Sequence, residues 1–238
     1  MNFNDIVDSI KEKPYYLDRD YGQVIYCSDN RLILPQIPDK SIDLVLTDPP
    51  YNVGIDYGDS SNDKLPAVAY QKLIKELIER FLVMTDGKVA LVLGSKPLLD
   101  WWMSIPKAKL IIVKMGAISN NKIKGLHLQY HPVLTTVQSN TYMSDLWEDI
   151  RWPGEGYFFN EERYGHPAMT PEKLARRLVS IFTDGPEKIV LDAYCGSGTM
   201  AVASKCLNRF FIGIEIEEKY CEIAKNRLAQ SVMRLETE

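Results

Sequence analysis

The sequence lacks several features that would assign it to a whole class of proteins. It has only four cysteines, without metal-type spacing such as Cys-x-x-Cys, so we expect reduced thiols and no structural metal. No apolar run reaches membrane-spanning length, and the polar, acidic first residues are unlike a signal peptide. These absences predict a cytoplasmic protein without a membrane partner, and its 238 residues are enough for one large domain.

Acidic residues are absent from one long segment, although they are frequent elsewhere. The chain has 32 Asp and Glu residues and a net charge of −4, yet residues 101–144 contain no acid. The same segment carries five lysines, among them Lys107, Lys122 and Lys124. One interpretation is a face that phosphate groups approach. The alternative, a buried strand pair with an incidental lysine cluster, stays open at this point.

Apolar runs typical of strands alternate with segments of helical spacing. The expected strands are 23–27, 42–47, 88–93, 110–113, 133–138, 189–191 and 210–214. The expected helices are 31–36, 67–84, 98–105, 170–182, 199–207 and 217–228, with Thr170 as the N-cap of the fourth. Residues 1–20 predict an irregular or helical lead-in. This alternation predicts an α/β fold with a mostly parallel sheet and helices on both faces.

The segment Asp48-Pro49-Pro50-Tyr51 follows directly on the apolar run 42–47. Neither proline can donate a backbone hydrogen bond and each fixes its own φ, so the turn is stiff and its carbonyls can accept. It lies where open α/β folds bind ligands, at the carboxyl edge of the sheet. The segment suits an exocyclic amine on a planar base, whose hydrogens Asp48 and a proline carbonyl accept while Tyr51 stacks on the ring. A plain Pro-Pro turn is the alternative.

A second cluster of candidate residues follows the predicted strand 189–191. The stretch Asp192 to Thr199 is rich in small residues, which let the backbone pass close to a ligand. Glu215 ends the next predicted strand, where a carboxylate can accept both hydroxyls of a ribose. Residues Gly196, Gly198 and Ala201 also match a loose dinucleotide pattern, so the residues alone leave the choice of nucleotide cofactor open.

The order of these two elements constrains the fold. The Asp48 segment precedes the glycine-rich loop, and only 23 residues follow Glu215. A sheet that starts with the strand at 189 cannot be completed in that space. The N-terminal half must therefore supply the remaining strands, which predicts a circularly permuted Rossmann-like fold.

Both elements resemble motifs of one enzyme family. Residues 48–51 resemble the signature of DNA amino-methyltransferases, which modify adenine N6 or cytosine N4, and residues 192–199 resemble their S-adenosylmethionine loop. The order of the two motifs is similar to that of the beta group. The likeness covers about residues 24–228 and implies S-adenosylmethionine as the cofactor.

The resemblance also implies roles for individual residues. Asp29 lies in an acidic turn that reads the cofactor adenine, and His166 lies in a His-Pro element beside the methionine part. The implied catalytic residues are Asp48, Pro49, Pro50 and Tyr51, and the other implied cofactor residues are Asp48, Asp192, Tyr194, Cys195, Gly196, Ser197, Gly198, Thr199 and Glu215. The family pattern continues Thr-Gln-Lys-Pro after the His-Pro element, whereas this chain has Ala168-Met169-Thr170-Pro171, so the role of that lysine is not carried over.

The implied activity is methylation of a flipped-out base in double-stranded DNA, with adenine N6 favoured because cytosine enzymes more often carry Ser in place of Asp48. Lys107, Lys122 and Lys124 are expected to contact DNA phosphates. Residues 1–238 are expected to form one methyltransferase domain, with a small target-recognition region inserted at 115–165, and a homodimer is an open expectation. The alternatives are a cytosine-N4 enzyme, an RNA or protein-amide methyltransferase, and an inactive DNA-binding homologue.

Overall fold

The computed structural model describes residues 1–56, 63–94, 98–105, 107–114, 130–138, 144–150 and 169–235. Within these ranges, nine strands form one sheet in the order β1-β2-β9-β8-β3-β4-β6-β5-β7. Their bounds are β1 (Tyr16–Asp18), β2 (Gln23–Cys27), β3 (Leu44–Thr47), β4 (Val89–Val92), β5 (Lys109–Lys114), β6 (Tyr130–Thr135), β7 (Leu146–Trp147), β8 (Ile189–Asp192) and β9 (Phe210–Glu215).

The two halves of the chain interleave in this sheet. The C-terminal strands β8 and β9 lie between the N-terminal strands β2 and β3, and the five strands from β2 to β4 are all parallel. The predicted circular permutation is therefore confirmed. From β8 the chain goes through one helix to β9 on one side, and from β3 through another helix to β4 on the other side. This divergence makes the β8–β3 boundary the topological switch point, where doubly wound folds bind ligands.

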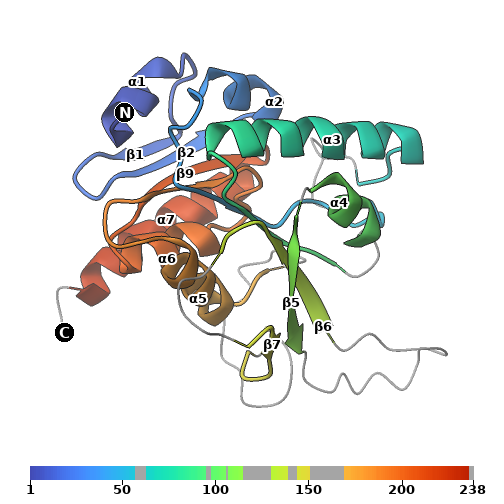
Figure 1. The fold of residues 1–238 in the computed structure, drawn as a ribbon. Coiled ribbons are helices and arrows are strands. Elements are labelled where there is room, and N and C mark those ends of the chain that lie inside the picture. Colours follow the sequence, from blue (N-terminus) through green and yellow to red (C-terminus); the bar gives the residue numbers. More distant parts are fainter. Residues whose placement is uncertain are drawn as a thin grey trace.

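Helices cover both faces of the sheet, as predicted (Figure 1). One face packs against α1 (Phe3–Ser9), α2 (Asn30–Ile33), the short 3-10 helix η1 (Leu34–Gln36), α3 (Ala67–Met84) and α4 (Leu98–Ser104). The other packs against α5 (Glu172–Phe182), α6 (Thr199–Cys206) and α7 (Glu218–Leu235). All four residues of β3 are buried because both of its faces are covered, which explains the continuous apolar run in the sequence.

Some elements differ from the prediction. The lead-in 1–20 contains the short strand β1 as well as a helix, and β7 lies in a segment without regular period. β6 begins at Tyr130 instead of residue 133, and α7 continues to Leu235 instead of ending at residue 228. β1 and β7 have three and two residues, which are too few to show a period in the sequence.

The proposed insertion at 115–165 is only partly described. Its described residues do not form a separate unit, because β6 and β7 both pair with β5 in the main sheet. The pairing of β5 with β6 confirms that the acid-free segment contains a strand pair, in which only Ile111 and Val113 of β5 are buried. In the part of the chain that the structure describes, no helix is long and apolar enough to span a bilayer. The described residues also contain no cluster of three or more potential metal ligands.

Candidate active site

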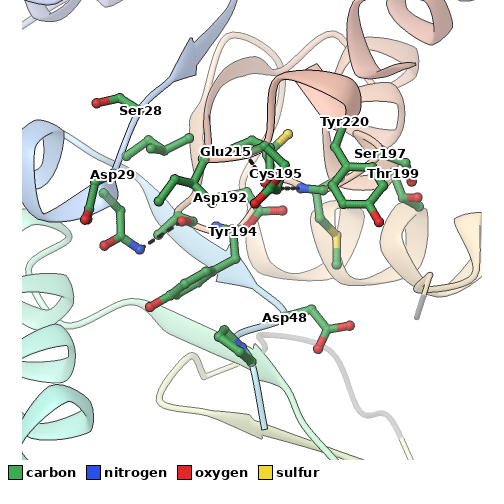
Figure 2. A pocket seen from close by; sticks show the side chains of 18 of the residues that line it. Ser28, Asp29, Asp48, Asp192, Tyr194, Cys195, Ser197, Thr199, Glu215 and Tyr220 are labelled. Carbon is green, nitrogen blue, oxygen red and sulfur yellow. Dashed lines mark hydrogen bonds between the residues drawn. The ribbon is translucent and has the colours of Figure 1, made fainter. Parts of the chain in front are cut away.

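A pocket of about 290 Å³ lies at the carboxyl edge of the parallel strands. It is bounded by the segments that follow β2, β3, β8 and β9, and therefore lies at the switch point between the two halves (Figure 2). Ten of the predicted site residues line it: Asp29, Asp48, Pro50, Asp192, Tyr194, Cys195, Gly196, Ser197, Thr199 and Glu215. The segments 48–51 and 192–199, distant along the chain, thus meet at one cavity.

Asp48 is held by two hydroxyl groups. The hydroxyl of Tyr51 donates to Oδ1 at 2.6 Å, and the hydroxyl of Thr170 donates to Oδ2 at 2.7 Å. Burial raises the pKa of Asp48 to about 6, and the two hydrogen bonds act in the opposite direction. The carboxylate is thus oriented from both sides, and it titrates just below neutral pH.

Thr170 was predicted as the N-cap of α5, and the structure shows that this prediction was wrong. Helix α5 begins at Glu172, Pro171 occupies the N-cap position, and no side chain caps the helix. A residue before proline is pushed toward extended geometry, so Thr170 stays outside the helix. Its hydroxyl donates to Asp48 instead.

The rest of the Asp-Pro-Pro-Tyr turn is braced by neighbouring elements. The hydroxyl of Tyr70 donates to the Pro50 carbonyl at 2.9 Å, and Trp101 Nε1 donates to Tyr70 Oη at 3.1 Å. The Pro50 carbonyl therefore accepts a hydrogen bond, as predicted for this turn, and its partner is Tyr70. The Tyr51 ring packs against Gly94, where a Cβ would lie 2.7 Å from the ring. Tyr51 is not among the residues that line the pocket.

A hydrogen bond joins the two motifs directly. Thr47, the last residue of β3, donates from its hydroxyl to Asp192 Oδ1 at 2.6 Å. The backbone N–H of Tyr194 donates to the same oxygen at 3.0 Å. Asp192 is only 2% exposed, and burial raises its pKa to about 7. Asp192 therefore fixes the start of the glycine-rich loop to the residue that precedes Asp48.

Glu215 is oriented by backbone N–H groups. Gly196 donates to Oε2 at 2.7 Å and Glu217 donates to Oε1 at 2.9 Å. Burial raises the pKa of Glu215, and these backbone donors counteract the shift. A carboxylate with two oxygens has about four acceptor sites, so the ribose hydroxyls predicted as its partners still have sites available.

Asp29 and the loop 196–199 are each held by an arginine. Asp29 accepts from the backbone and the guanidinium of Arg31, which lowers its pKa. Arg227, 6% exposed on α7, donates to the Ser197 carbonyl at 2.8 Å and to the Thr199 hydroxyl at 3.0 Å. Arg227 was not predicted, since nothing in the spacing of the sequence links α7 to the loop. Arg31 was not predicted either, although it lies only two positions after Asp29.

Asp63 binds the main chain of the segment that follows the Asp-Pro-Pro-Tyr turn. Its carboxylate accepts from four consecutive backbone N–H groups, those of Asn52, Val53, Gly54 and Ile55, at 2.6 to 3.0 Å. Asp63 is 5% exposed and lines the pocket. Asp63 was not predicted as a site residue, and its hydrogen bonds tie it to the segment that follows the turn.

The charge of the pocket favours S-adenosylmethionine over a dinucleotide as the cofactor. Six carboxyl groups line it, those of Asp29, Asp48, Asp63, Asp192, Glu215 and Glu217. A pyrophosphate would be repelled by them, whereas the sulfonium and ammonium of S-adenosylmethionine would be attracted. Burial raises the pKa of Asp48, Asp192 and Glu215, so a bound cation would also relieve their desolvation. The residues present therefore fit S-adenosylmethionine.

Several predicted residues lie elsewhere. Pro49 is buried, and neither Pro49 nor Gly198 is among the residues that line the pocket. A Cβ on Gly198 would meet Ala224 of α7. Lys107 is exposed just before β5, whose first residue pairs with Thr135 of β6. Thr135 in turn pairs with Ala90 near the start of β4, so Lys107 lies at the opposite edge of the sheet from the pocket. His166, Lys122 and Lys124 lie outside the described residues.

Curated relatives cover most of the chain. It is 28% identical to the type II methyltransferase M.BglII of Bacillus subtilis, over 84% of this chain and 67% of the relative. It is 29% identical to the type II methyltransferase M.HpaI of Haemophilus parainfluenzae, over 87% of this chain and 74% of the relative. Identity to the DNA adenine methyltransferase YhdJ of Escherichia coli strain K12 is 24%, over 82% of this chain and 79% of that protein.

Solved structures share the fold. The M1.HpyAVI–SAM complex superposes with a TM-score of 0.62 at 24% identity, over 87% of this chain and all of that chain. The PvuII DNA methyltransferase, described as cytosine-N4-specific, gives a TM-score of 0.66 at 16% identity, over 92% of this chain and 96% of that chain. Together they confirm the predicted methyltransferase fold.

The family model described as DNA methylase, of the N6/N4 type, matches residues 101–226, which is more than half of the chain. The matched range includes the glycine-rich loop and Glu215, and the Asp-Pro-Pro-Tyr turn lies against it across the pocket. The chain therefore belongs to the DNA methylase family of S-adenosylmethionine-dependent amino-methyltransferases.

Proposed function

We propose that this enzyme methylates the N6 amino group of an adenine that has been flipped out of duplex DNA. The observation that carries the proposal is the position of Asp48, a pocket-lining carboxylate of the Asp-Pro-Pro-Tyr turn, beside the loop 192–199. Adenine is favoured over cytosine because the first position of the turn is Asp, and because the relative YhdJ is named a DNA adenine methyltransferase. A base inside a duplex cannot reach such a pocket, so it must leave the stack.

The proposed chemistry depends mainly on position and charge. When bound, S-adenosylmethionine supplies a methyl group on a positively charged sulfur. Asp48 and the Pro49 carbonyl accept the two hydrogens of the target amine, which concentrates its lone pair on nitrogen. Tyr51 and Thr170 occupy one acceptor site on each Asp48 oxygen and leave another for the amine. The proton that the amine loses passes to the Asp48 carboxylate and from there to water.

Replacing Asp48 tests this assignment. We expect Asp48→Ala to lower methyl transfer to DNA by on the order of 100-fold or more, because the amine loses its charged acceptor. Binding of S-adenosylmethionine, measured by calorimetry, should change little, since most of the pocket remains. Exposed Asp20 on the β1–β2 turn provides the control, and Asp20→Ala should leave both quantities unchanged.

The wild-type product decides the base. Mass spectrometry of nucleosides from methylated plasmid should show N6-methyladenine. N4-methylcytosine would instead establish the cytosine alternative. Transfer to RNA or protein alone, or no transfer at all, would contradict the proposed function, and near-normal turnover by Asp48→Ala would contradict the catalytic role.

We further propose that DNA approaches the carboxyl edge of the sheet. Lys114 ends β5 and pairs with Tyr130 of β6. Because Val133 of β6 pairs with Val92, the last residue of β4, Lys114 lies beyond the carboxyl end of β4. Lys107 lies at the opposite edge. Lys122 and Lys124 follow Lys114 in the sequence and stay proposed phosphate contacts, as does the role of residues 115–165 in target recognition. Both described lysines are exposed, and Lys107 serves as the control. The Lys114 ammonium contacts Glu148 at 2.7 Å, so a DNA phosphate would have to displace that carboxylate.

The lysine pair gives a direct measurement. Lys114→Ala should weaken DNA binding and reduce the slope of log affinity against log salt by about one, because one phosphate contact is lost. Lys107→Ala should change neither. Binding is measured by fluorescence anisotropy at several salt concentrations, and equal effects of the two substitutions would show that DNA does not select this edge.

A homodimer is also proposed, acting in the cytoplasm, where DNA and S-adenosylmethionine are both present. The support is an apolar surface on α4, where Leu99 is 68% exposed, Met103 is 81% exposed and Trp102 is 38% exposed. Large apolar side chains grouped on one short helix mark a surface suited to protein contact.

A further inference from the structure

We propose that Thr170 is a positioning residue for methyl transfer, whose hydroxyl holds the Asp48 carboxylate in the orientation that accepts the target amine. This inference rests on the proposed function of the site. It assigns a role to a residue that the sequence predicted only as a helix cap.

The first argument is the geometry of the carboxylate. Thr170 donates to Oδ2 at 2.7 Å while Tyr51 donates to Oδ1 at 2.6 Å. With a different donor on each oxygen, the carboxylate cannot rotate about its Cβ–Cγ bond without breaking both hydrogen bonds. Tyr51 belongs to the same turn as Asp48 and moves with it, so Thr170 is the donor that ties Asp48 to a separate element.

The second argument is the rigidity of the segment that carries Thr170. Thr170 is 5% exposed, and the following residue, Pro171, fixes the entry to α5. Leu174 and Leu178, on the buried side of α5, have no exposed surface, so the helix is packed firmly on the sheet. A hydroxyl carried by such a segment has little freedom to move away from its acceptor.

The third argument is that helix stability does not explain this residue. The side chain of Thr170 makes no capping hydrogen bond to α5, and its hydroxyl is directed to Asp48. The choice of a neutral donor also matters at this position. A threonine hydroxyl orients the carboxylate without neutralising it, whereas the ammonium of a lysine would compete with the target amine for its charge.

Three substitutions at this position separate orientation from packing. Thr170→Val keeps the shape and removes the hydroxyl, Thr170→Ser keeps the hydroxyl, and Thr170→Lys adds a charge. For each variant, kcat, the KM values for S-adenosylmethionine and DNA, the pH profile of kcat and the melting temperature are measured. The titration of Asp48 is followed by NMR with carbon-13-labelled aspartate, and the signal is assigned with Asp48→Asn.

We expect Thr170→Val to lower kcat about tenfold with both KM values within about twofold, and Thr170→Ser to restore most of the rate. The groups facing Asp48 are Tyr51, Thr170 and Asp192. Since the Thr170 hydrogen bond lowers the pKa of Asp48, its loss should move the acidic limb of kcat and the NMR titration to higher pH. Thr170→Lys should move both to lower pH.

Two results would overturn the inference. One is a Thr170→Val enzyme with wild-type kcat, and the other is an Asp48 titration that Thr170→Val leaves unchanged. The NMR titration does not require turnover, so it tests the link between the two residues even if the wild-type enzyme fails to methylate adenine. A failure of the proposed function is therefore recognised separately, from the wild-type product alone.

Discussion

Six carboxyl groups line the pocket, and Asp192 is the one whose charge can be tested in isolation. It is 2% exposed, and its pKa is raised to about 7 by burial. Its Oδ1 accepts from Thr47 and from the Tyr194 N–H, and an amide oxygen could accept both. Asp192→Asn thus removes a buried charge while keeping the two hydrogen bonds.

The sign of the pH effect follows from the direction of the pKa shift. In the unfolded chain the pKa of Asp192 is near 3.8, the ordinary value for an aspartate, whereas in the folded protein burial raises the pKa to about 7. The stabilising effect of the raised pKa is complete below the unfolded value and is lost as the pH rises through about 7. We expect Asp192→Asn to raise the melting temperature at pH 8 and to change it much less at pH 5. An equal change at both pH values would show that charge is not the cause.

Single residues also show where sequence reasoning succeeds at this site. Asp48 directly follows β3, and Asp192 and Glu215 end β8 and β9, so the shared edge of the three residues could be predicted. Thr170 lies 122 positions from Asp48, and no local pattern reports a hydrogen bond over that separation. The role of Tyr70 in holding Pro50 was also missed, because in the sequence a tyrosine on the buried face of a helix cannot be distinguished from other core residues.

At the level of elements, the glycine-rich loop depends on close packing against α7. Gly198 has φ +81°, and a Cβ there would lie 2.7 Å from Ala224 Cβ and 3.0 Å from Ala224 Cα. The second contact is with the main chain, so α7 itself would have to move. Because Arg227 on the same helix holds Ser197 and Thr199, that movement would also disturb the loop.

We expect Gly198→Ala to destabilise the protein by about 2–4 kcal/mol, combining backbone strain of about 1 kcal/mol with overpacking of about 1–3 kcal/mol. Binding of S-adenosylmethionine should weaken as well. Gly185 has φ +91° with nothing within 4 Å of its Cβ position, so Gly185→Ala should show the strain alone. Chemical denaturation and calorimetry measure the two effects, and equal losses in both variants would rule out the contact with α7 as the cause.

Element prediction worked where packing produces a clear period. Helix α3 was predicted with its observed bounds because Leu73, Leu77, Ile78, Phe81 and Leu82 recur at helical spacing. The structure buries Leu77, Ile78 and Phe81, and it buries the other two in part. β6 was placed three residues late, since its first two residues are only half-buried and Pro132 interrupts the run. Pairing partners, which fix such bounds, come from β4 and β5 and cannot be read from the segment itself.

For the whole molecule, the proposed homodimer depends on the exposed side of α4. The substitutions Leu99→Glu and Met103→Glu together place two charges on this surface and should convert a dimer to a monomer. Val83→Glu provides the control. Val83 is 47% exposed and lies near the end of α3, whereas the contact of α3 with α4 is made by Tyr70 near its start. Sedimentation equilibrium gives the mass, and a wild-type monomer at all concentrations would contradict the proposal.

The placement of β8 and β9 between β2 and β3 also has a consequence for synthesis on the ribosome. While the first half of the polypeptide emerges, β2 and β3 have no neighbours on their facing edges, and the backbone groups there must remain hydrated. Those edges can pair only after residues 189–215 have been translated. The central sheet, and with it the pocket between its two halves, can therefore be completed only near the end of translation.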